Sequence, residues 1–327
     1  MKLVWKILVF SIFICATFFM TYDRDVSNIN NISRPVRIDE LDLLDQMHDN
    51  NSKSDIVNET VDWYSADFQD RNFSYRFLKH PGYCDRSVEV LIIVLSMTNN
   101  FELRETIRQT WGAANDTRVR INFLFSGHPS ITNETDVIMT NLPDTYENLI
   151  VKVHSLLTYK SQFCANASYV LKIDEDAIVN IPEVLARLQA VPPIADPNSL
   201  MCFVWKNALP KRDRNSKWYM PRTFWPSKYY PNYCNGPMYI IGSNVINKML
   251  CETKNQKFWK LEDVFWTGVI AQVLRIRHFE WNHLHSTNVK TANVKKCHKK
   301  VPFVTWYDFK PAGEIRSAYE ILKNDTC

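Results

Sequence analysis

Hydrophobic and polar positions divide the chain of 327 residues into three parts. Residues 7–22 (ILVFSIFICATFFMTY) form an uncharged apolar run. Residues 23–85 are polar and rich in Asn, Asp and Ser, and residues 86–327 alternate between apolar and polar segments. Because the middle part lacks sustained periodicity, we expect a tether there rather than a core. The packed domain is expected to begin at about residue 86.

The third part opens with sequence that is typical of a strand. Residues 88–95 form an apolar and largely β-branched run that is interrupted only by Glu89, which predicts a strand buried on both faces. Further strands are expected at residues 119–125, 136–140 and 169–173, and helices at 101–111, 146–163, 182–189 and 264–274. This alternation predicts an α/β fold with a mainly parallel sheet and flanking helices. Ligands bind such sheets beyond the carboxyl ends of the strands.

The apolar run at 7–22 has two interpretations, a cleaved signal peptide and a retained membrane anchor. As a helix it would span about 24 Å, slightly less than the ~30 Å hydrocarbon core of a bilayer. The run ends in Phe18–Met20, which lacks the small side chains that a cleavage site needs, so an anchor is favoured. Lys2 and Lys6 lie on its N-terminal side. This bias predicts a cytoplasmic tail at 1–6, a transmembrane signal anchor at 7–22 and a lumenal stem at 23–85.

Two further patterns indicate a lumenal body. Beyond Cys15 in the apolar run, seven cysteines are widely spaced without CxxC or His/Cys clusters, so disulfides are expected and a zinc site is not. An odd number leaves at least one free or intermolecular, and their pairing stays open. The N-x-S/T glycosylation pattern occurs eight times, at Asn31, Asn50, Asn58, Asn72, Asn115, Asn133, Asn166 and Asn324.

Composition adds two limits. Hydrophobic residues make up 46% of the chain, which is enough for a packed core, and the formal net charge is +4. The charge is interpreted as spread along the chain, since no long basic run stands out. A nucleic-acid partner is therefore not expected.

The acidic triplet Asp174–Asp176 directly follows the strand expected at 169–173. Two carboxylates in a D-x-D pattern can hold a hard cation that also binds the phosphates of a nucleotide sugar. A solvated turn is the structural alternative. The chain contains neither GxGxxG nor GxxxxGK[ST], so a glycine-rich loop is not present to hold a diphosphate. A divalent cation is the natural substitute.

Four sequence blocks occur in a fixed order: FELRETIRQTWG at 101–112, DTYENLIVKV at 144–153, ASYVLKIDEDAIVN at 167–180 and LEDVFWTG at 261–268. In order, spacing and content they resemble the β-1,3-galactosyltransferase family, which also includes β-1,3-N-acetylglucosaminyltransferases. The resemblance covers about residues 84–285. It implies a GT-A-like fold and a hexosyltransferase that uses UDP-galactose or UDP-N-acetylglucosamine, Mn²⁺ and an inverting mechanism.

The resemblance also implies partners and a location. The acceptor would be a glycoprotein or a glycolipid. Together with the anchor, the family implies a single-pass type II protein of the Golgi membrane, with residues 86–327 as the lumenal catalytic domain.

Carried over residue by residue, the resemblance makes Asp176 the main metal ligand. Asp174 would support the metal or the donor ribose, as would Glu175, where the family more often has Asp. Three basic residues are placed at the donor by the same comparison, with a surface or packing role as the alternative for each: Arg104, Arg108 and Lys152.

A second acidic pair, Glu262–Asp263, precedes the helix expected at 264–274. An inverting transferase needs one carboxylate to deprotonate the acceptor hydroxyl, and the resemblance assigns this role to Asp263, with Glu262 binding the acceptor. The structural alternative is a pair of carboxylates that stabilise the N-terminus of that helix.

Aromatic residues are dense at 217–239. Trp218, Trp225 and Tyr229 are candidate platforms for an acceptor sugar, with core packing as the alternative for each. The family also uses a late histidine as a second metal ligand. His285 is preferred for this role over His278 and His283.

Two other functions compete with a transferase. An inactive lectin-like or chaperone-like lumenal protein could keep the same fold, and a glycosidase could use two carboxylates without a metal. The intact D-x-D and Glu-Asp pairs favour the transferase.

Overall fold

The computed structural model describes residues 62–113, 115–128, 132–190, 195–287, 304–307, 309 and 312–324. The chain divides after Thr60, and all described residues belong to the second unit, which begins at Val61. The expected tail, the expected anchor and most of the expected stem therefore lie outside the described residues. Within the described ranges, no helix is both long enough and apolar enough to cross a membrane.

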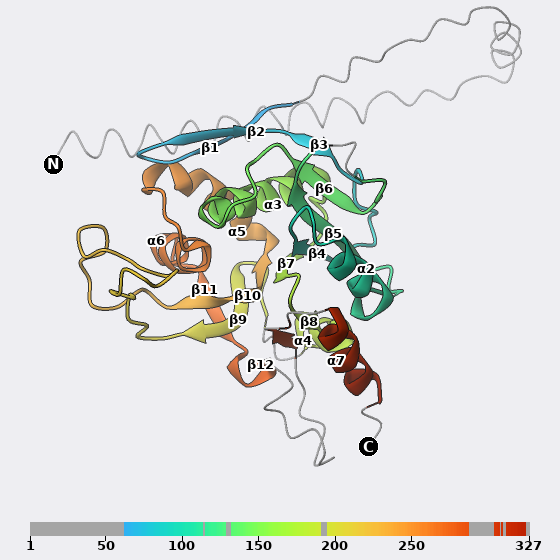
Figure 1. Cartoon of the computed structure of the whole chain (residues 1–327). Coiled ribbons are helices and arrows are strands. Elements are labelled where there is room, and N and C mark those ends of the chain that lie inside the picture. Colours follow the sequence, from blue (N-terminus) through green and yellow to red (C-terminus); the bar gives the residue numbers. More distant parts are fainter. Residues whose placement is uncertain are drawn as a thin grey trace, which may run out of the picture. The chain divides into compact units, whose positions relative to one another are not determined.

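The folded unit is built around an eight-stranded sheet with the order β11-β9-β10-β7-β4-β5-β6-β3 (Figure 1). Its centre consists of four parallel strands: β4 (Val90–Leu95), β5 (Val119–Ser126), β6 (Val137–Thr140) and β7 (Tyr169–Asp174). All six residues of β4 are buried, as its continuous apolar run predicts. The α/β class is confirmed.

The remaining strands make the sheet mixed rather than mainly parallel. β10 (Tyr233–Gly242) runs antiparallel to β7 and to β9 (Ser199–Trp205), and β3 (Phe77–Lys79) runs antiparallel to β6. β11 (Arg277–Glu280) lies parallel to β9. An alternation of strands and helices predicts only the parallel centre, because antiparallel neighbours need no helical crossover.

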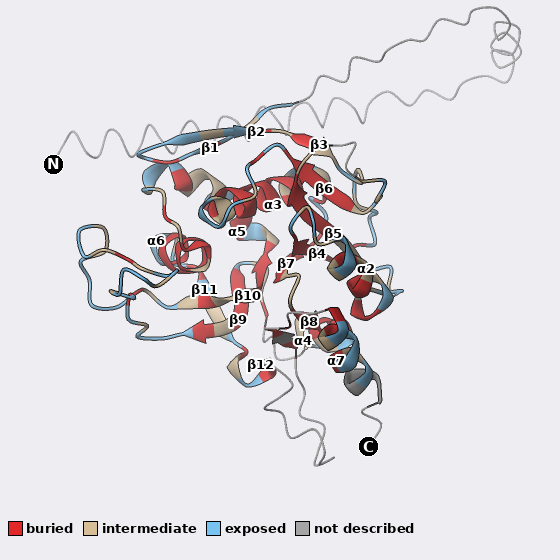
Figure 2. Ribbon diagram, in the orientation of Figure 1, coloured by how far each residue is buried: buried red, intermediate tan, exposed pale blue. Residues whose placement is uncertain are grey.

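Helices cover both faces of the sheet, and its central strands β4, β6 and β7 are almost entirely buried (Figure 2). Alternate residues of β4 fall into two core clusters, one containing residues of α3 and α5 and the other containing residues of α4 and α7, as the period of a strand requires. The α-helices are α2 (Phe101–Gln109), α3 (Leu149–Phe163), α4 (Ile181–Leu188), α5 (Ser243–Glu252), α6 (Ala271–Val273) and α7 (Ala312–Asn324). The short 3₁₀ turns are η3 (Trp111–Ala113), η5 (Tyr146–Asn148), η6 (Thr253–Asn255) and η8 (Asn282–Leu284).

Two expected helices differ in detail. Asn100 occupies the N-cap of α2 without making a cap hydrogen bond, and its side-chain amide donates to Glu175. The helix expected at 264–274 begins as a π-helix, η7 (Val264–Ile270), and becomes α-helical only at α6. π-Helical turns often mark functional sites.

The folded unit begins earlier than residue 86. β1 (Tyr64–Asp67) and β2 (Asn72–Tyr75) form a hairpin, and β3 joins the main sheet through β6. The buried Tyr75 hydroxyl donates a hydrogen bond of 2.8 Å to Thr158 on α3. The boundary at 85/86 is therefore a correction: residues 64–79 belong to the folded unit and not to a stem.

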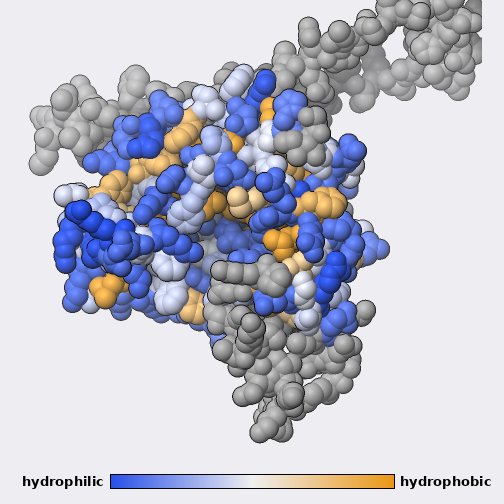
Figure 3. Space-filling view, viewed as in Figure 1, coloured by the Kyte–Doolittle hydropathy of each residue, from blue (hydrophilic) through white to orange (hydrophobic). Residues whose placement is uncertain are grey.

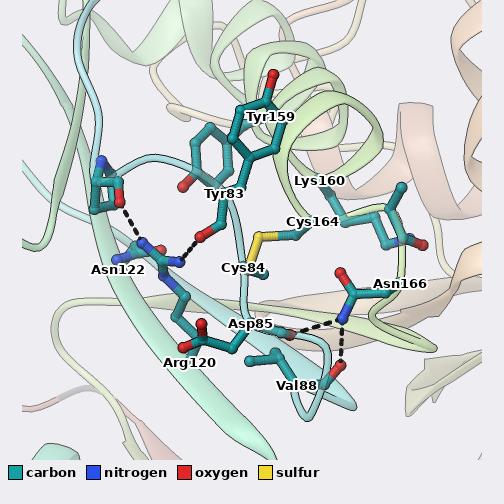
Figure 4. The surroundings of a disulfide bond; sticks show 12 residues. Tyr83, Cys84, Asp85, Val88, Arg120, Asn122, Tyr159, Lys160, Cys164 and Asn166 are labelled. Atoms are coloured by element: carbon teal, nitrogen blue, oxygen red, sulfur yellow. Dashed lines mark hydrogen bonds between the residues drawn. A yellow bond between two sulfur atoms is a disulfide. The ribbon is translucent and has the colours of Figure 1, made fainter. Parts of the chain in front are cut away.

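Two disulfides are present within the described ranges, Cys84–Cys164 and Cys202–Cys234. Figure 4 shows the first, which joins the chain entering β4 to the end of α3. Beside it the Asn166 amide donates to the carbonyl oxygens of Asp85 and Val88. Cys251 is disulfide-bonded as well, and the described part of the chain contains no free cysteine.

A small sheet follows the acidic triplet. β8 (Ile178–Val179) pairs with β13 (Thr305–Tyr307), which in turn pairs with β12 (His285–Thr287). The Asp176 carbonyl oxygen accepts a hydrogen bond of 3.0 Å from the backbone of Phe309. A segment from the C-terminal part of the chain thus lies beside the triplet.

Candidate active site

The acidic triplet lies at the carboxyl end of β7, where the α/β rule places a site. Asp174 is the last residue of β7 and pairs with Leu95, the last residue of the neighbouring parallel strand β4. Its side chain is 38% exposed, so the carboxylate faces the open edge of the sheet. The buried strand therefore delivers a partly solvated carboxylate to the position where two strands end together.

A buried lysine that the sequence analysis did not identify organises this edge. Lys172 points from β7 with a side chain that is only 2% exposed. Its ammonium group lies 2.5 Å from Asp174 Oδ1, 3.2 Å from Glu262 Oε1 and 2.6 Å from the carbonyl oxygen of Gly236. Burial alone would lower the pKa of Lys172, but the charges of Asp174 and Glu262 raise it above its ordinary value. Lys172 therefore joins the two acidic elements as a charged bridge.

Glu262 is the buried half of the second acidic pair. Its Oε1 faces Lys172, and its Oε2 accepts a hydrogen bond of 2.9 Å from the Tyr239 hydroxyl on β10. Burial raises the pKa of Glu262, and Lys172 opposes that shift. With both oxygens held, Glu262 is fixed in orientation.

Asp263 immediately precedes η7. Its Oδ1 accepts a hydrogen bond of 2.8 Å from the backbone of Val264. Burial raises the pKa of Asp263 to about 7, and the charge of the adjacent Glu262 adds to the effect. A carboxylate with a pKa near 7 is matched to accepting a proton at neutral pH.

The backbone of Gly236 lies directly against the Asp263 side chain. A Cβ atom at this position would lie 3.2 Å from Asp263 Oδ2, which is tighter than ordinary contact. Gly236 lies in an irregularity of β10 between Cys234 and Tyr239, where the register against β9 shifts. The glycine therefore lets the strand approach the carboxylate closely.

Three residues expected at the donor converge on one loop, Ser96–Asn100, between β4 and α2. Glu175 accepts hydrogen bonds from the Ser96 hydroxyl (2.5 Å), the Met97 backbone (3.3 Å) and the Asn100 amide. Burial raises the pKa of Glu175, and these hydrogen bonds oppose the increase. Glu175 thus ties the acidic triplet to this loop.

Arg104 and Lys152 hold the same loop from beneath. The Arg104 guanidinium is 2% exposed and donates to Ser96 Oγ and to the carbonyl oxygens of Met97 and Thr98. Its remaining N–H groups contact Glu134, so all five donors are used within the protein. Lys152 donates to the Ser96 carbonyl oxygen at 2.6 Å and to Asp144 at 2.8 Å. In this conformation both residues shape the loop instead of presenting donors to a ligand.

Arg108 is likewise committed to carboxylates. It contacts Glu134 at 2.5 Å and Asp136 at 2.8 Å and lies over the ring of Phe123. Arg104 and Arg108 together lower the pKa of Glu134 to about 2, against the effect of its burial. The paired arginines fix the segment that carries Glu134.

The aromatic candidates divide into two groups. Trp218 and Tyr229 are 47% and 40% exposed. Trp225 instead packs edge-on against Trp259 with ring centroids 4.9 Å apart, and its indole donates to the Tyr229 carbonyl oxygen. These contacts correspond to the packing alternative for Trp225.

Tyr146 on η5 is a second site residue that the sequence analysis missed. Burial raises the pKa of its hydroxyl to about 12, and the charges of Asp263, Glu262 and Asp174 act in the same direction. The neighbouring Trp218 indole opposes the increase in the pKa. Tyr146 therefore lies between the carboxylates and the exposed aromatic side chains. Its place in the DTYENL block was the available signal.

The described residues contain no group of three His, Cys, Asp or Glu side chains close enough to hold a metal ion. The expected set of Asp174, Asp176 and His285 is therefore not brought together. Burial lowers the pKa of His285 to about 4, and neither ring nitrogen has a hydrogen-bond partner within the described part of the chain. The carboxylates of Asp174 and Asp176, at and just beyond the end of β7, are still the type of ligand that a hard cation prefers, with its other ligands supplied by a diphosphate and water.

Comparison with known proteins identifies the family. The galactosyltransferase family model matches residues 102–282, more than half of the chain. Beta-1,3-galactosyltransferase 1 of Mus musculus and of Homo sapiens are each 31% identical over 229 residues, covering 64% of this chain and 69% of the relative. Beta-1,3-galactosyltransferase 2 of Homo sapiens is 27% identical over 278 residues, covering 77% of this chain and 64% of the relative.

A solved structure of the WbbM bifunctional glycosyltransferase in its apo form covers 72% of this chain and 51% of that chain, at 13% identity and a TM-score of 0.41. That likeness is too low to support an argument. The family match and the first two relatives define the class as a hexosyltransferase. The chain belongs to the galactosyltransferase family.

Proposed function

We propose that the protein transfers galactose from UDP-galactose to a glycan hydroxyl in β-1,3 linkage, with inversion at the anomeric carbon. The names of the relatives support galactose and the linkage, and UDP-N-acetylglucosamine is the alternative donor. The acceptor is a glycoprotein or a glycolipid. The expected single anchor at 7–22 supports a type II protein of the Golgi membrane.

One observation supports the proposal. Lys172 lies within 3.2 Å of both Asp174 and Glu262, so Asp174 and the Glu262–Asp263 pair form one site. Asp263 is the carboxylate with a pKa of about 7 in that site. A transferase needs such a pairing, because the leaving diphosphate and the attacking hydroxyl meet at one carbon.

Asp263 acts as the general base. It accepts the proton of the acceptor hydroxyl while the acceptor oxygen forms a bond to the anomeric carbon of the donor. The bond from that carbon to the diphosphate breaks, and UDP leaves with the electron pair. One displacement of this kind inverts the configuration.

The surrounding residues orient these groups. Glu262 is immobilised by Lys172 and Tyr239, so its negative charge stays beside Asp263 and helps to keep the pKa of Asp263 raised. Asp174 and Asp176 would hold a Mn²⁺ ion, which when bound would offset the negative charge of the leaving diphosphate. The braced loop Ser96–Asn100 is the proposed surface for the nucleotide, since three donor candidates shape it.

The full-length chain in detergent, incubated with a panel of UDP-sugars, Mn²⁺ and several β-linked acceptors, tests the proposal. We expect transfer from UDP-galactose and a β-1,3 linkage in the product by NMR. Product with retained configuration would exclude a single displacement by Asp263. Absence of both transfer and donor hydrolysis with every combination would contradict the enzyme itself and favour a lectin-like protein.

A further inference from the structure

The positive charge of the chain is concentrated in one segment between β9 and β10. Residues 206–228 contain seven Lys or Arg residues and one acidic residue, Asp213. The rest of the chain has 32 basic and 34 acidic residues and is therefore slightly acidic. This distribution corrects the interpretation of the charge as evenly spread. Figure 3 shows strongly hydrophilic side chains over this part of the surface, at the left.

Five of the seven basic residues are available to a ligand. Lys206 is paired with Glu280 at 2.6 Å, and Arg212 donates to the carbonyl oxygens of Met220, Trp225 and Ser227. Arg212 therefore braces the segment. The other five side chains are exposed and have no carboxylate partner within the described ranges. These residues are Lys211, Arg214, Lys217, Arg222 and Lys228.

Two of these ammonium groups lie next to exposed aromatic rings. Lys217 Nζ lies 4.6 Å from the centroid of the Trp218 ring, and Lys228 Nζ lies 5.0 Å from that of Tyr229. A flat ring offers an apolar surface with a fixed geometry, and an adjacent cation adds a charge contact. Together they match a sugar ring that carries an anionic group.

The segment lies next to the catalytic pair. Lys260, two residues before Glu262, has its Nζ 5.9 Å from the centroid of the Tyr219 ring. Trp218 acts on the pKa of Tyr146, which is also raised by the charges of Asp263, Glu262 and Asp174. The basic groups thus lie beside a site that is rich in carboxylates.

We propose that the segment at 206–228 recognises a carboxylate or sulfate group on the acceptor glycan, one sugar or more away from the hydroxyl that reacts. The aromatic rings of Trp218 and Tyr229 contact the sugar faces, and the exposed cations contact the anionic group. The inference rests on the proposed transferase function and adds an acceptor class to it. The acidic site repels the same anionic group, so the charge arrangement also orients the acceptor.

An anionic membrane surface is the rival occupant of the basic segment. The position of Trp218 beside Tyr146 favours the acceptor, because membrane docking would not require contact with the catalytic carboxylates. The acceptor proposal also predicts an effect on KM that membrane docking does not.

The test compares three acceptors that share one reacting sugar: neutral, carboxylate-bearing and sulfate-bearing. Full-length protein is used with its donor, and the variant is the triple substitution Lys217→Gln, Arg222→Gln and Lys228→Gln. The matched control replaces three lysines outside the segment: Lys248→Gln, Lys254→Gln and Lys257→Gln. Donor hydrolysis without acceptor is measured for each protein.

We expect the triple variant to raise KM about tenfold for at least one anionic acceptor, since each exposed charge contact contributes a few-fold. KM for the neutral acceptor, donor hydrolysis and the control variant should change by less than about twofold. The carboxylate and sulfate arms identify which anion is recognised. The difference should shrink in high salt because exposed charges are screened.

Equal KM values for neutral and anionic acceptors in the unmodified protein would overturn the inference while leaving the transferase intact. So would a triple variant that loses binding to anionic vesicles without a change in KM, a result that would indicate membrane docking. Absence of transfer and donor hydrolysis in the unmodified protein would instead contradict the proposed function.

Discussion

Lys172 provides the most demanding test of the site's construction, and Lys172→Met is the perturbation. The substitution keeps a side chain of similar length and removes the charge between Asp174 and Glu262. Asp174 is 38% exposed, so water can solvate it when the lysine is lost. Glu262 is 8% exposed and would be left as a buried charge with one hydrogen bond, from Tyr239.

The magnitude follows from that difference in exposure. Leaving one partner of a buried ion pair uncompensated costs about 3–5 kcal/mol. For a domain of this size that corresponds to a fall in Tm of about 10 °C. The loss should be smaller at pH 5 than at pH 8, because protonation of Glu262 removes the unpaired charge.

Thermal unfolding followed by circular dichroism, without metal or donor, measures the effect. The double variant Lys172→Met with Glu262→Gln is the control, since Gln keeps an oxygen for Tyr239 and carries no charge. It should recover at least half of the lost stability. A decrease in Tm of less than about 2 °C for Lys172→Met, or no recovery of Tm in the double variant, would refute the bridging role.

Four further predictions concern the base and the donor loop. If Asp263 must be ionised, kcat/KM should fall about tenfold per pH unit below pH 7, and a profile that is flat from pH 5 to pH 8 would exclude it as the base. Because folding raises the pKa of Asp263, ionisation of Asp263 destabilises the folded protein as the pH rises from about 4 to 7. Differential scanning calorimetry should therefore show that Asp263→Asn raises Tm at pH 8 and not at pH 4. Gly236→Ala should lower kcat by about tenfold to a hundredfold with little change in UDP affinity, because its Cβ displaces Asp263; an unchanged kcat would show that the close approach is dispensable. Glu175→Ala should weaken UDP binding about tenfold in calorimetry by releasing the loop Ser96–Asn100, whereas a variant at the exposed Glu320, Glu320→Ala, should not.

The sequence predicts the centre of the sheet because burial on both faces favours a mainly apolar run. Residues 88–95 and 169–173 are such runs, each with one charge, and β4 and β7 lie within or over them. β1 and β2 alternate in burial, with few apolar positions, and their pairing with one another is not visible in local sequence. They consequently fell within the expected stem.

The acidic residues of the candidate site could be located from the sequence, but the contacts among them could not. Lys172 is the one charge among residues 169–173, which is a signal that the strand has a buried ionic partner. Its partner Glu262 is 90 residues away, so only the fold brings them together. The arginines were expected at a ligand because their donors suit phosphate. In the structure both donate to Glu134, and this contact is not visible in local sequence because Glu134 lies far along the chain.

The measurement that tests the central claim most directly separates donor binding from turnover in Asp263→Asn. The full-length variant and the unmodified protein are compared for UDP-galactose affinity by calorimetry and for transfer to a neutral β-linked acceptor, both with Mn²⁺. The account predicts equal donor affinity within about twofold and a loss of transfer of at least about a hundredfold. Transfer that continues at a rate close to that of the unmodified protein would contradict the assignment of Asp263 as the base.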